Sequence, residues 1–473
     1  MDGFNLKNIP HTNFIFDFKT PGGYLPFGYT KYTIGENILR KLKSNDEPHT
    51  GYYPSLERPY EFHFNRTSAF STYIVEYTPK TSFNITTEIK DDVKPNEIYV
   101  VVLEALNVNN LFEYYSADKF ELDDFFSPQL IQLLKKHNNF KIVFMDSREG
   151  AYIHDEKLLK KINTFLDKHN IKHVNKVIIS TNNNFITELN NSKEMNNRIS
   201  VYSNNYCLLT AGRFISELRV KNNTLVENNY EYSIQEELDY SDKEKYFLMY
   251  NRNSERMHRP YFVNKLYKEN LLDLGYVSFF ENPYFEDFLE NSSVFPELDL
   301  VQEDISDIKE NYKNYYPLTI DETDSERVAD FHNFLSRKNE YQNSYFTIIS
   351  ETNAESRYSF ITEKTIKPIM NLHPFVVLGN PKTLEVLRSF GFITFSKWWD
   401  ESYDNEFDFK KRTDMVFNIV KDLCSKSKEE MNDMVREMED ILIHNKKILH
   451  RLYTSKVFQK EFFKVLTKGY SII

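Results

Sequence analysis

The segment YFTIISETNAESRYSFITEKTIKPIMNLHPFVVLG, residues 345–379, decides the fold of this chain. It opens with an apolar run at 345–349, which has the length of a buried strand. Thr362 stands where it can cap a helix, and a second apolar run at 375–378 is closed by Gly379. The pattern predicts a strand–helix–strand unit. Its polar loop, 351–359, opens at the carboxyl end of the first strand, where parallel sheets bind ligands and a helix N-terminus favours an anion.

Similar alternations of strand-like and helix-like segments lie on both sides of this unit. Asn222–Asp242, rich in Asn, Glu and Tyr, is the best linker candidate between them. We therefore predict an α/β protein with one domain at 1–235, a second at 236–440 and a helical tail at 441–473. The further strands are expected at 98–103, 141–145, 177–180, 246–250, 276–280 and 392–395.

Composition narrows the classes of function. The chain has 473 residues and a net charge of -11, and it lacks a run of Lys and Arg that would coat nucleic acid, which argues against a nucleic-acid partner. No apolar run reaches the roughly 18 residues of a membrane span, and the first residues do not resemble a secretory signal. The two cysteines, Cys207 and Cys424, are far apart and are expected to be reduced thiols.

The focal segment resembles the hallmark of family-10 glycosyltransferases, the α1,3-fucosyltransferase group. The resemblance is carried by 350–353 (SETN), 360–364 (FITEK) and 375–379 (FVVLG). It implies the GT-B fold, in which two Rossmann-like domains face each other across a cleft. Without the membrane anchor that eukaryotic members carry, the chain is similar to the soluble bacterial or viral type. We expect such a protein in the cytoplasm of a bacterium or of a virus-infected host cell.

The resemblance also implies a donor site. Glu363 and Lys364 would bind a nucleotide-sugar, with Lys364 near the pyrophosphate. A second similar segment, 253–261, makes Arg259 the phosphate-binding arginine and Arg256 its rival, and an arginine fork suits a diphosphate. Each residue also has a purely structural interpretation. Lys364 could be a surface charge, Glu363 a helix cap, and either arginine a partner in a salt bridge to the acidic region 281–340. Further donor contacts are expected from Glu351, Asn353 and Phe360.

Inverting sugar transfer needs a base for the acceptor hydroxyl and positive charge for the departing diphosphate. We expect the base in the N-terminal half, on the loop after the strand at 141–145, with Glu149 first and Asp146 next. No Asp-x-Asp pair follows a strand, so no metal is expected. The co-substrate would be a nucleotide-diphosphate sugar, with a GDP-sugar favoured. The sugar would be fucose or similar, and the acceptor a glycan or another hydroxyl.

Three alternatives stay open. Glu355 and Glu363 have the E-x7-E spacing of retaining GT-B enzymes. The chain could instead be a non-catalytic glycan-binding protein of the same fold. A phage-type glucosyltransferase acting on DNA bases is the third, and the acidic balance argues against it.

Overall fold

The computed structural model describes residues 9–15, 83–86, 90–104, 122–145, 156–181, 190–203, 205, 208, 218–221, 224–227, 241–251, 254–279, 282–292, 298–320, 338–354 and 361–468. The chain folds into two compact units. Unit 1 is Met1–Tyr206 together with Lys456–Ile473, and unit 2 is Cys207–Ser455. The predicted boundaries at 235 and 440 differ from this division. The predicted tail at 441–473 begins inside one helix, Glu439–Thr454, and its residues are shared between the units.

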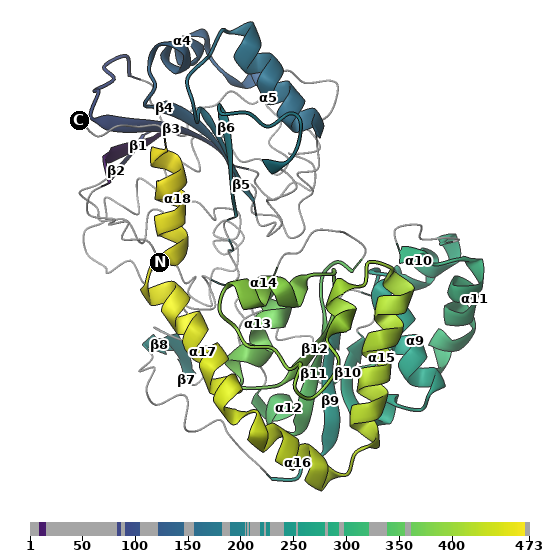
Figure 1. Ribbon diagram of the computed structural model, residues 1–473. Coiled ribbons are helices and arrows are strands. Elements are labelled where there is room, and N and C mark those ends of the chain that lie inside the picture. The colour runs from purple at the N-terminus through teal and green to yellow at the C-terminus, as the bar shows by residue number, and fades with distance from the viewer. Residues whose placement is uncertain are drawn as a thin grey trace. The chain divides into compact units, whose positions relative to one another are not determined.

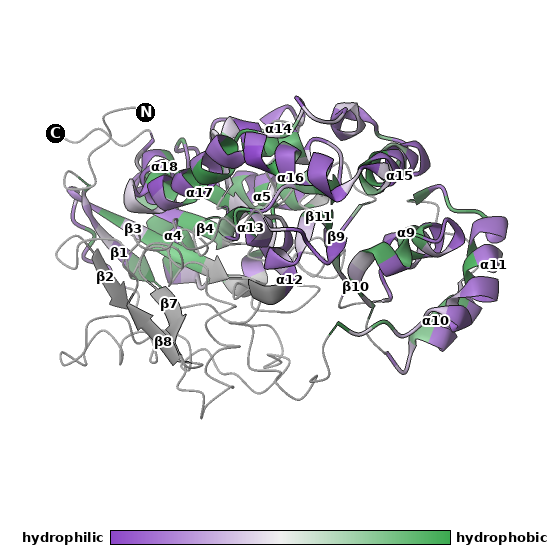
Figure 2. Cartoon of the chain, turned by 90° about the horizontal axis from the view of Figure 1, so that it is seen from below, coloured by the Kyte–Doolittle hydropathy of each residue, from purple (hydrophilic) through white to green (hydrophobic). Residues whose placement is uncertain are grey.

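Unit 1 contains a six-stranded sheet in which every described pairing is parallel. The strand order is β2-β1-β3-β4-β5-β6. Val, Ile and Phe side chains dominate the inner strands, as expected for a parallel sheet that is covered on both faces, and Figure 2 shows β3 and β4 as largely hydrophobic. The strands are β1 His11–Ile15, β2 Phe83–Thr86, β3 Glu97–Glu104, β4 Phe140–Met145, β5 Val177–Thr181 and β6 Ile199–Ser203.

The helices of unit 1 include one from the far end of the chain. Helix α4 (Pro128–Lys136) and helix α5 (Glu156–Lys168) follow β3 and β4, and the 3-10 helix η5 (Leu122–Phe125) precedes α4. Helix α18 (Val457–Thr467) belongs to unit 1 and lies beside β6. The Tyr202 hydroxyl donates to the Phe458 carbonyl at 2.7 Å, and the two rings of Tyr202 and Phe462 pack edge to face. The last helix therefore completes the first unit.

The described residues of unit 2 form a parallel four-stranded sheet with the order β10-β9-β11-β12. From β9 the chain passes through α9 to β10, and from β11 it passes through α13 to β12, so the two connections run in opposite directions. Figure 1 shows α9 and α15 along one side of this sheet and α13 and α17 along the other. The strands are β9 Lys245–Asn251, β10 Gly275–Phe279, β11 Ser344–Ser350 and β12 Phe375–Leu378, with a separate antiparallel pair, β7 Leu218–Lys221 and β8 Thr224–Glu227.

Helices surround the sheet of unit 2, and their exposed faces are polar, as Figure 2 shows for α11. The helices are α9 His258–Lys268, α10 Phe285–Asn291, α11 Gln302–Asn311, α12 Lys338–Gln342, α13 Glu363–Met370, α14 Thr383–Ser389, α15 Phe409–Ser425, α16 Lys428–Glu437 and α17 Glu439–Thr454. Short 3-10 turns are η6 Leu272–Leu274, η8 Tyr312–Asn314 and η11 Ser402–Asn405.

Two parallel sheets with helices confirm the predicted α/β class and the two Rossmann-like domains, and the predicted strand–helix–strand unit is β11, α13 and β12. The strand expected at 392–395 is wrong, because Ile393 and Phe395 bond to side chains and the Phe392 N–H bonds to the Leu387 carbonyl, not to a neighbouring strand. The Asn445 amide donates to the Ile393 carbonyl at 2.8 Å and accepts from its N–H at 2.8 Å. The Glu401 carboxylate accepts from the Phe395 N–H at 2.6 Å.

Candidate functional site

The candidate site lies where the chain of unit 2 diverges, at the carboxyl ends of β9 and β11. These strands are neighbours in the sheet, but the helices that follow them leave in opposite directions. In open parallel sheets, ligands bind in the crevice at such a switch point. The starts of α9 and α13 both lie at this edge, and most of the described residues that the sequence singled out are found there.

Glu351 organises this edge. It follows β11, is 2% exposed, and its carboxylate accepts from the Thr362 hydroxyl at 2.6 Å and from the Thr365 hydroxyl. The N–H groups of Thr352 and Thr362 also point at it, at 3.2 and 3.4 Å. A Cβ on Gly379 would lie 3.1 Å from the Glu351 Cβ, so the glycine lets this side chain sit against β12. Glu351 is therefore an internal acceptor that fixes the loop and the start of α13.

The Glu351 backbone ties α9 to β11. Its carbonyl oxygen accepts from His258 Nε2 at 2.9 Å and from Arg259 Nη2 at 3.2 Å. A carbonyl can only accept, so His258 carries its proton on Nε2. Burial, helped by the Arg259 charge, lowers the pKa of His258 well below its usual value, which keeps the ring neutral. Arg259 is 3% exposed, so its hydrogen bond to the Glu351 carbonyl lies in the interior of the protein.

Lys364 lies against the next residue of the same loop. Its ammonium donates to the Thr352 hydroxyl at 3.2 Å and to the Glu363 carboxylate at 2.7 Å. Burial opposes ionisation of Glu363, but the charges of Lys364 and Lys367 outweigh it and lower the pKa of Glu363. The side chains of Lys364 and Glu363 are 20% and 12% exposed. Arg259 and Lys364 thus contact two consecutive residues, Glu351 and Thr352, from two different helices.

Arg256 is the accessible arginine of the pair that the sequence proposed. It is exposed, in the turn before α9, and its Nη1 donates to the Asn353 side-chain oxygen at 3.3 Å. Asn353 belongs to the loop after β11, so this contact also bridges the two strand ends. The structure therefore brings six predicted residues together: Arg256, Arg259, Glu351, Asn353, Glu363 and Lys364.

Four other candidate site residues lie outside the described residues: Asp146, Glu149, Glu355 and Phe360. For these side chains the sequence predictions stand as predictions. Asp146 and Glu149 follow β4 directly in the chain.

Several residues of the site gave no usable sequence signal. Thr365 lies in the first turn of α13, and its hydroxyl donates to the buried Glu351 carboxylate. Arg412 lies in α15, far along the chain, yet its guanidinium donates to the carbonyls of Gly379, at 3.0 Å, and Ala354. This buried arginine fastens the ends of β11 and β12 to α15. Contacts between residues so distant in sequence cannot be inferred from spacing.

No group of three or more His, Cys, Asp or Glu side chains among the described residues is arranged to hold a metal ion. None of their helices is long and apolar enough to cross a membrane. The groups that the site does present are cations, hydroxyls and helix N-termini, which are groups that bind phosphate.

No protein-family model and no curated protein matches the chain. Among solved structures, it is similar to the N-terminal domain of Candida albicans trehalose-6-phosphate phosphatase, with 11% identity, a TM-score of 0.36, and coverage of 80% of this chain and 72% of that one. It is also similar to T4 phage BGT in complex with UDP-glucose, with 10% identity, a TM-score of 0.35, and coverage of 97% and 99%. A third is the DNA-modifying enzyme beta-glucosyltransferase, with 10% identity, a TM-score of 0.33, and coverage of 96% and 99%. At these identities and TM-scores the similarity carries no inference about function.

Proposed function

We propose that the protein is a glycosyltransferase that moves a sugar from a nucleotide-diphosphate donor to an acceptor hydroxyl. The observation that carries this proposal is the convergence of cations at the switch point of unit 2. Lys364 from α13 contacts Thr352. The two arginines at the start of α9, Arg259 and Arg256, contact Glu351 and Asn353 on either side of Thr352. The sequence resemblance of the same loop and helix to family-10 glycosyltransferases supports it. We also propose the GT-B arrangement, with unit 2 as the donor domain.

In this proposal the cations supply the charge that stabilises the leaving nucleoside diphosphate. Lys364 binds a phosphate oxygen, and Glu363, held ionised by Lys364, accepts hydrogen bonds from donor hydroxyls. With positive charge supplied by the chain, no divalent ion is needed for the departure of the diphosphate.

The transfer itself is a single displacement with inversion. The acceptor oxygen attacks the anomeric carbon while its proton passes to a carboxylate base. The bond from the anomeric carbon to the diphosphate oxygen breaks, and the diphosphate leaves with the electron pair. Glu149, followed by Asp146, is the proposed base from unit 1. The proposed donor is a GDP-sugar carrying fucose or a similar sugar, and the proposed acceptor is a glycan or another hydroxyl compound.

A thermal-shift panel of GDP, UDP, ADP and CMP tests donor binding. We expect at least one nucleoside diphosphate to raise the unfolding temperature of the parent, since a ligand that binds only the folded state stabilises it. The response should be lost in Lys364→Ala and kept in Lys421→Ala. Lys421 is the matched control, because it also pairs with a glutamate, Glu269, at 2.6 Å within unit 2.

Turnover separates the proposed function from its rivals. Release of the diphosphate from a GDP-sugar in the presence of a chelator supports the metal-independent reaction, and loss of turnover that manganese restores contradicts it. The anomer of the product distinguishes inversion from a retaining reaction that uses Glu355 and Glu363. A protein that responds to glycans but to no nucleoside diphosphate would be a binding protein and not a transferase.

A further inference from the structure

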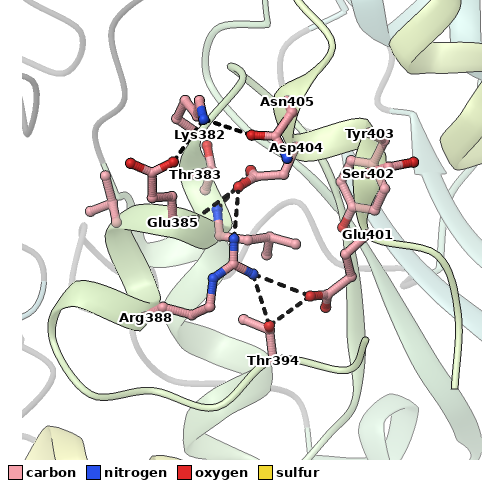
Figure 3. A network of polar contacts seen from close by, with 12 residues as sticks. Lys382, Thr383, Glu385, Arg388, Thr394, Glu401, Ser402, Tyr403, Asp404 and Asn405 are labelled. Carbon is pink, nitrogen blue, oxygen red and sulfur yellow. Dashed lines mark hydrogen bonds and ion pairs between the residues drawn. The ribbon is translucent and has the colours of Figure 1, made fainter. Parts of the chain in front are cut away.

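Helices α9, α13 and α14 follow strands whose carboxyl ends lie at one edge of the sheet in unit 2, and side chains of the chain itself cap the N-termini of α13 and α14. At α13, the Thr362 hydroxyl accepts from the Lys364 N–H at 3.1 Å, and the Glu351 carboxylate lies behind it. At α14, the Asp404 carboxylate accepts from the N–H groups of Leu384 and Glu385 at 2.8 and 2.9 Å. Figure 3 shows Asp404 in the network that carries this cap. Both helix ends are therefore already capped by side chains of the chain itself.

The N-terminus of α9 holds no such acceptor among the described residues. Met257, at its N-cap, makes no side-chain cap, and the first turn contains no acidic residue. The Arg259 N–H bonds to the Arg256 carbonyl at 2.8 Å, and Pro260 has no N–H. The N–H groups of Met257 and His258 therefore remain without an acceptor within the helix. This end of an 11-residue helix keeps its positive potential.

Buried polar side chains beside this helix end give a second, independent indication of a ligand. Two polar side chains here are fully buried. They are the Ser254 hydroxyl, in the turn that leads into α9, and the Asn251 side-chain amide, at the end of β9. In the described part of the chain neither has a hydrogen-bond partner, and the buried Ser350 hydroxyl at the end of β11 has none either. A buried polar group left unsatisfied costs about 1–3 kcal/mol. Three such groups at one sheet edge indicate a place for a polar ligand.

The two arginines differ in what they can offer such a ligand. Arg259 is buried, and its guanidinium and the His258 ring share the Glu351 carbonyl, so it joins α9 to β11. Arg256 is exposed, and within the described residues its guanidinium donates to the Asn353 side-chain oxygen. A guanidinium has five N–H donors and can grip a phosphate with two of them.

We propose that the N-terminus of α9, with the Ser254 hydroxyl and the Arg256 guanidinium, binds a phosphate group of the nucleotide. Arg259 is then a positioning residue that sets α9 against the loop after β11. This assignment rests on the proposed function. It departs from the sequence resemblance, which makes Arg259 the phosphate-binding arginine and Arg256 its rival.

Calorimetric titration with inorganic pyrophosphate, and with the nucleoside diphosphate that responds in the thermal-shift panel, tests the assignment. We expect Arg256→Ala to weaken binding of both ligands about 10- to 100-fold, which is the loss of a charge-assisted hydrogen bond. Ser254→Ala should weaken it about 3- to 10-fold. Arg256→Ala should not move the unfolding temperature of the unliganded protein by more than about 2 °C. Ser254→Ala should not lower it, because this change removes a buried hydroxyl that has no hydrogen-bond partner in the described part of the chain. Arg436→Ala, which removes an exposed arginine of α16, is the matched control and should bind like the parent.

Conservative replacements separate the two arginines. Arg259→Lys keeps a cation that can donate to the Glu351 carbonyl, so its affinity for the ligand should be higher than that of Arg259→Ala. Arg259→Ala should also lower the unfolding temperature, and Arg259→Lys should not. Arg256→Lys cannot make the bidentate hydrogen bonds of a guanidinium, so its affinity for pyrophosphate should stay low. Parent-like binding by Arg256→Ala and Ser254→Ala would overturn the assignment, even where a nucleotide binds and Lys364→Ala abolishes that binding. Pyrophosphate binding that depends on Arg256, without transfer from any sugar donor, would support the assignment and refute the proposed function.

Discussion

Replacement of Glu351 tests whether its carboxylate stabilises the loop after β11 and the start of α13. Glu351→Ala removes the acceptor of two threonine hydroxyls, on Thr362 and Thr365, and of two backbone N–H groups. The hydroxyls can rotate to other acceptors, but the amides cannot, and each stranded buried amide costs about 1–3 kcal/mol. Burial raises the pKa of Glu351, so loss of the carboxylate recovers part of its desolvation cost. We expect a net loss of about 2–4 kcal/mol from the free energy of unfolding of unit 2.

The chain provides its own probe for this measurement. Its two tryptophans, Trp398 and Trp399, both lie in unit 2, so their fluorescence during urea unfolding reports on that unit. Glu351→Gln keeps one carbonyl acceptor and should cost about 1 kcal/mol. The control Glu290→Ala, at an exposed position of α10, should stay within about 0.5 kcal/mol of the parent. Parent-like stability of Glu351→Ala, or equal damage by Gln and Ala, would refute the role given to this carboxylate.

Two further predictions concern the interiors of the units. Burial lowers the pKa of His373 from 6.5 to about 4, so the unfolded chain binds this proton more tightly and stability falls as pH drops from about 6.5 to about 4. The free energy of unfolding should fall by about 3 kcal/mol over this range. Urea unfolding at several pH values should show a correspondingly smaller pH dependence for His373→Gln than for the parent. The same pH dependence in both would contradict this prediction. Tyr202→Phe removes the hydrogen bond to α18 and should speed hydrogen exchange in that helix roughly 5-fold, for about 1 kcal/mol. Exchange at the parent rate would show that this bond does not hold the helix.

The sequence was informative wherever local pattern decides structure. Strand β11, the Thr362 cap, helix α13 and β12 follow from apolar runs and a capping residue within one short segment. The placement of six polar residues at one sheet edge follows from the rule that carboxyl ends of parallel strands meet at the same edge.

Features set by distant parts of the chain were out of reach. The segment 392–395 is apolar enough for a strand, but the Asn445 amide, from α17, takes the hydrogen bonds of Ile393 that a neighbouring strand would make. The buried state of Arg259 could not be told from the exposed state of Arg256, because both belong to one charged stretch. The Glu351 carbonyl, in the loop after β11 and far along the chain, distinguishes them, because only Arg259 donates to it.

The most direct test is calorimetric titration of a nucleoside diphosphate into the parent, Lys364→Ala, Lys364→Arg and Lys421→Ala, each shown to be folded by tryptophan fluorescence. Loss of the Lys364 ammonium should weaken binding about 10- to 100-fold, with arginine restoring part of it and the control binding like the parent. Equal affinity in the parent and in Lys364→Ala would show that the cations at the ends of β9 and β11 do not form a diphosphate site.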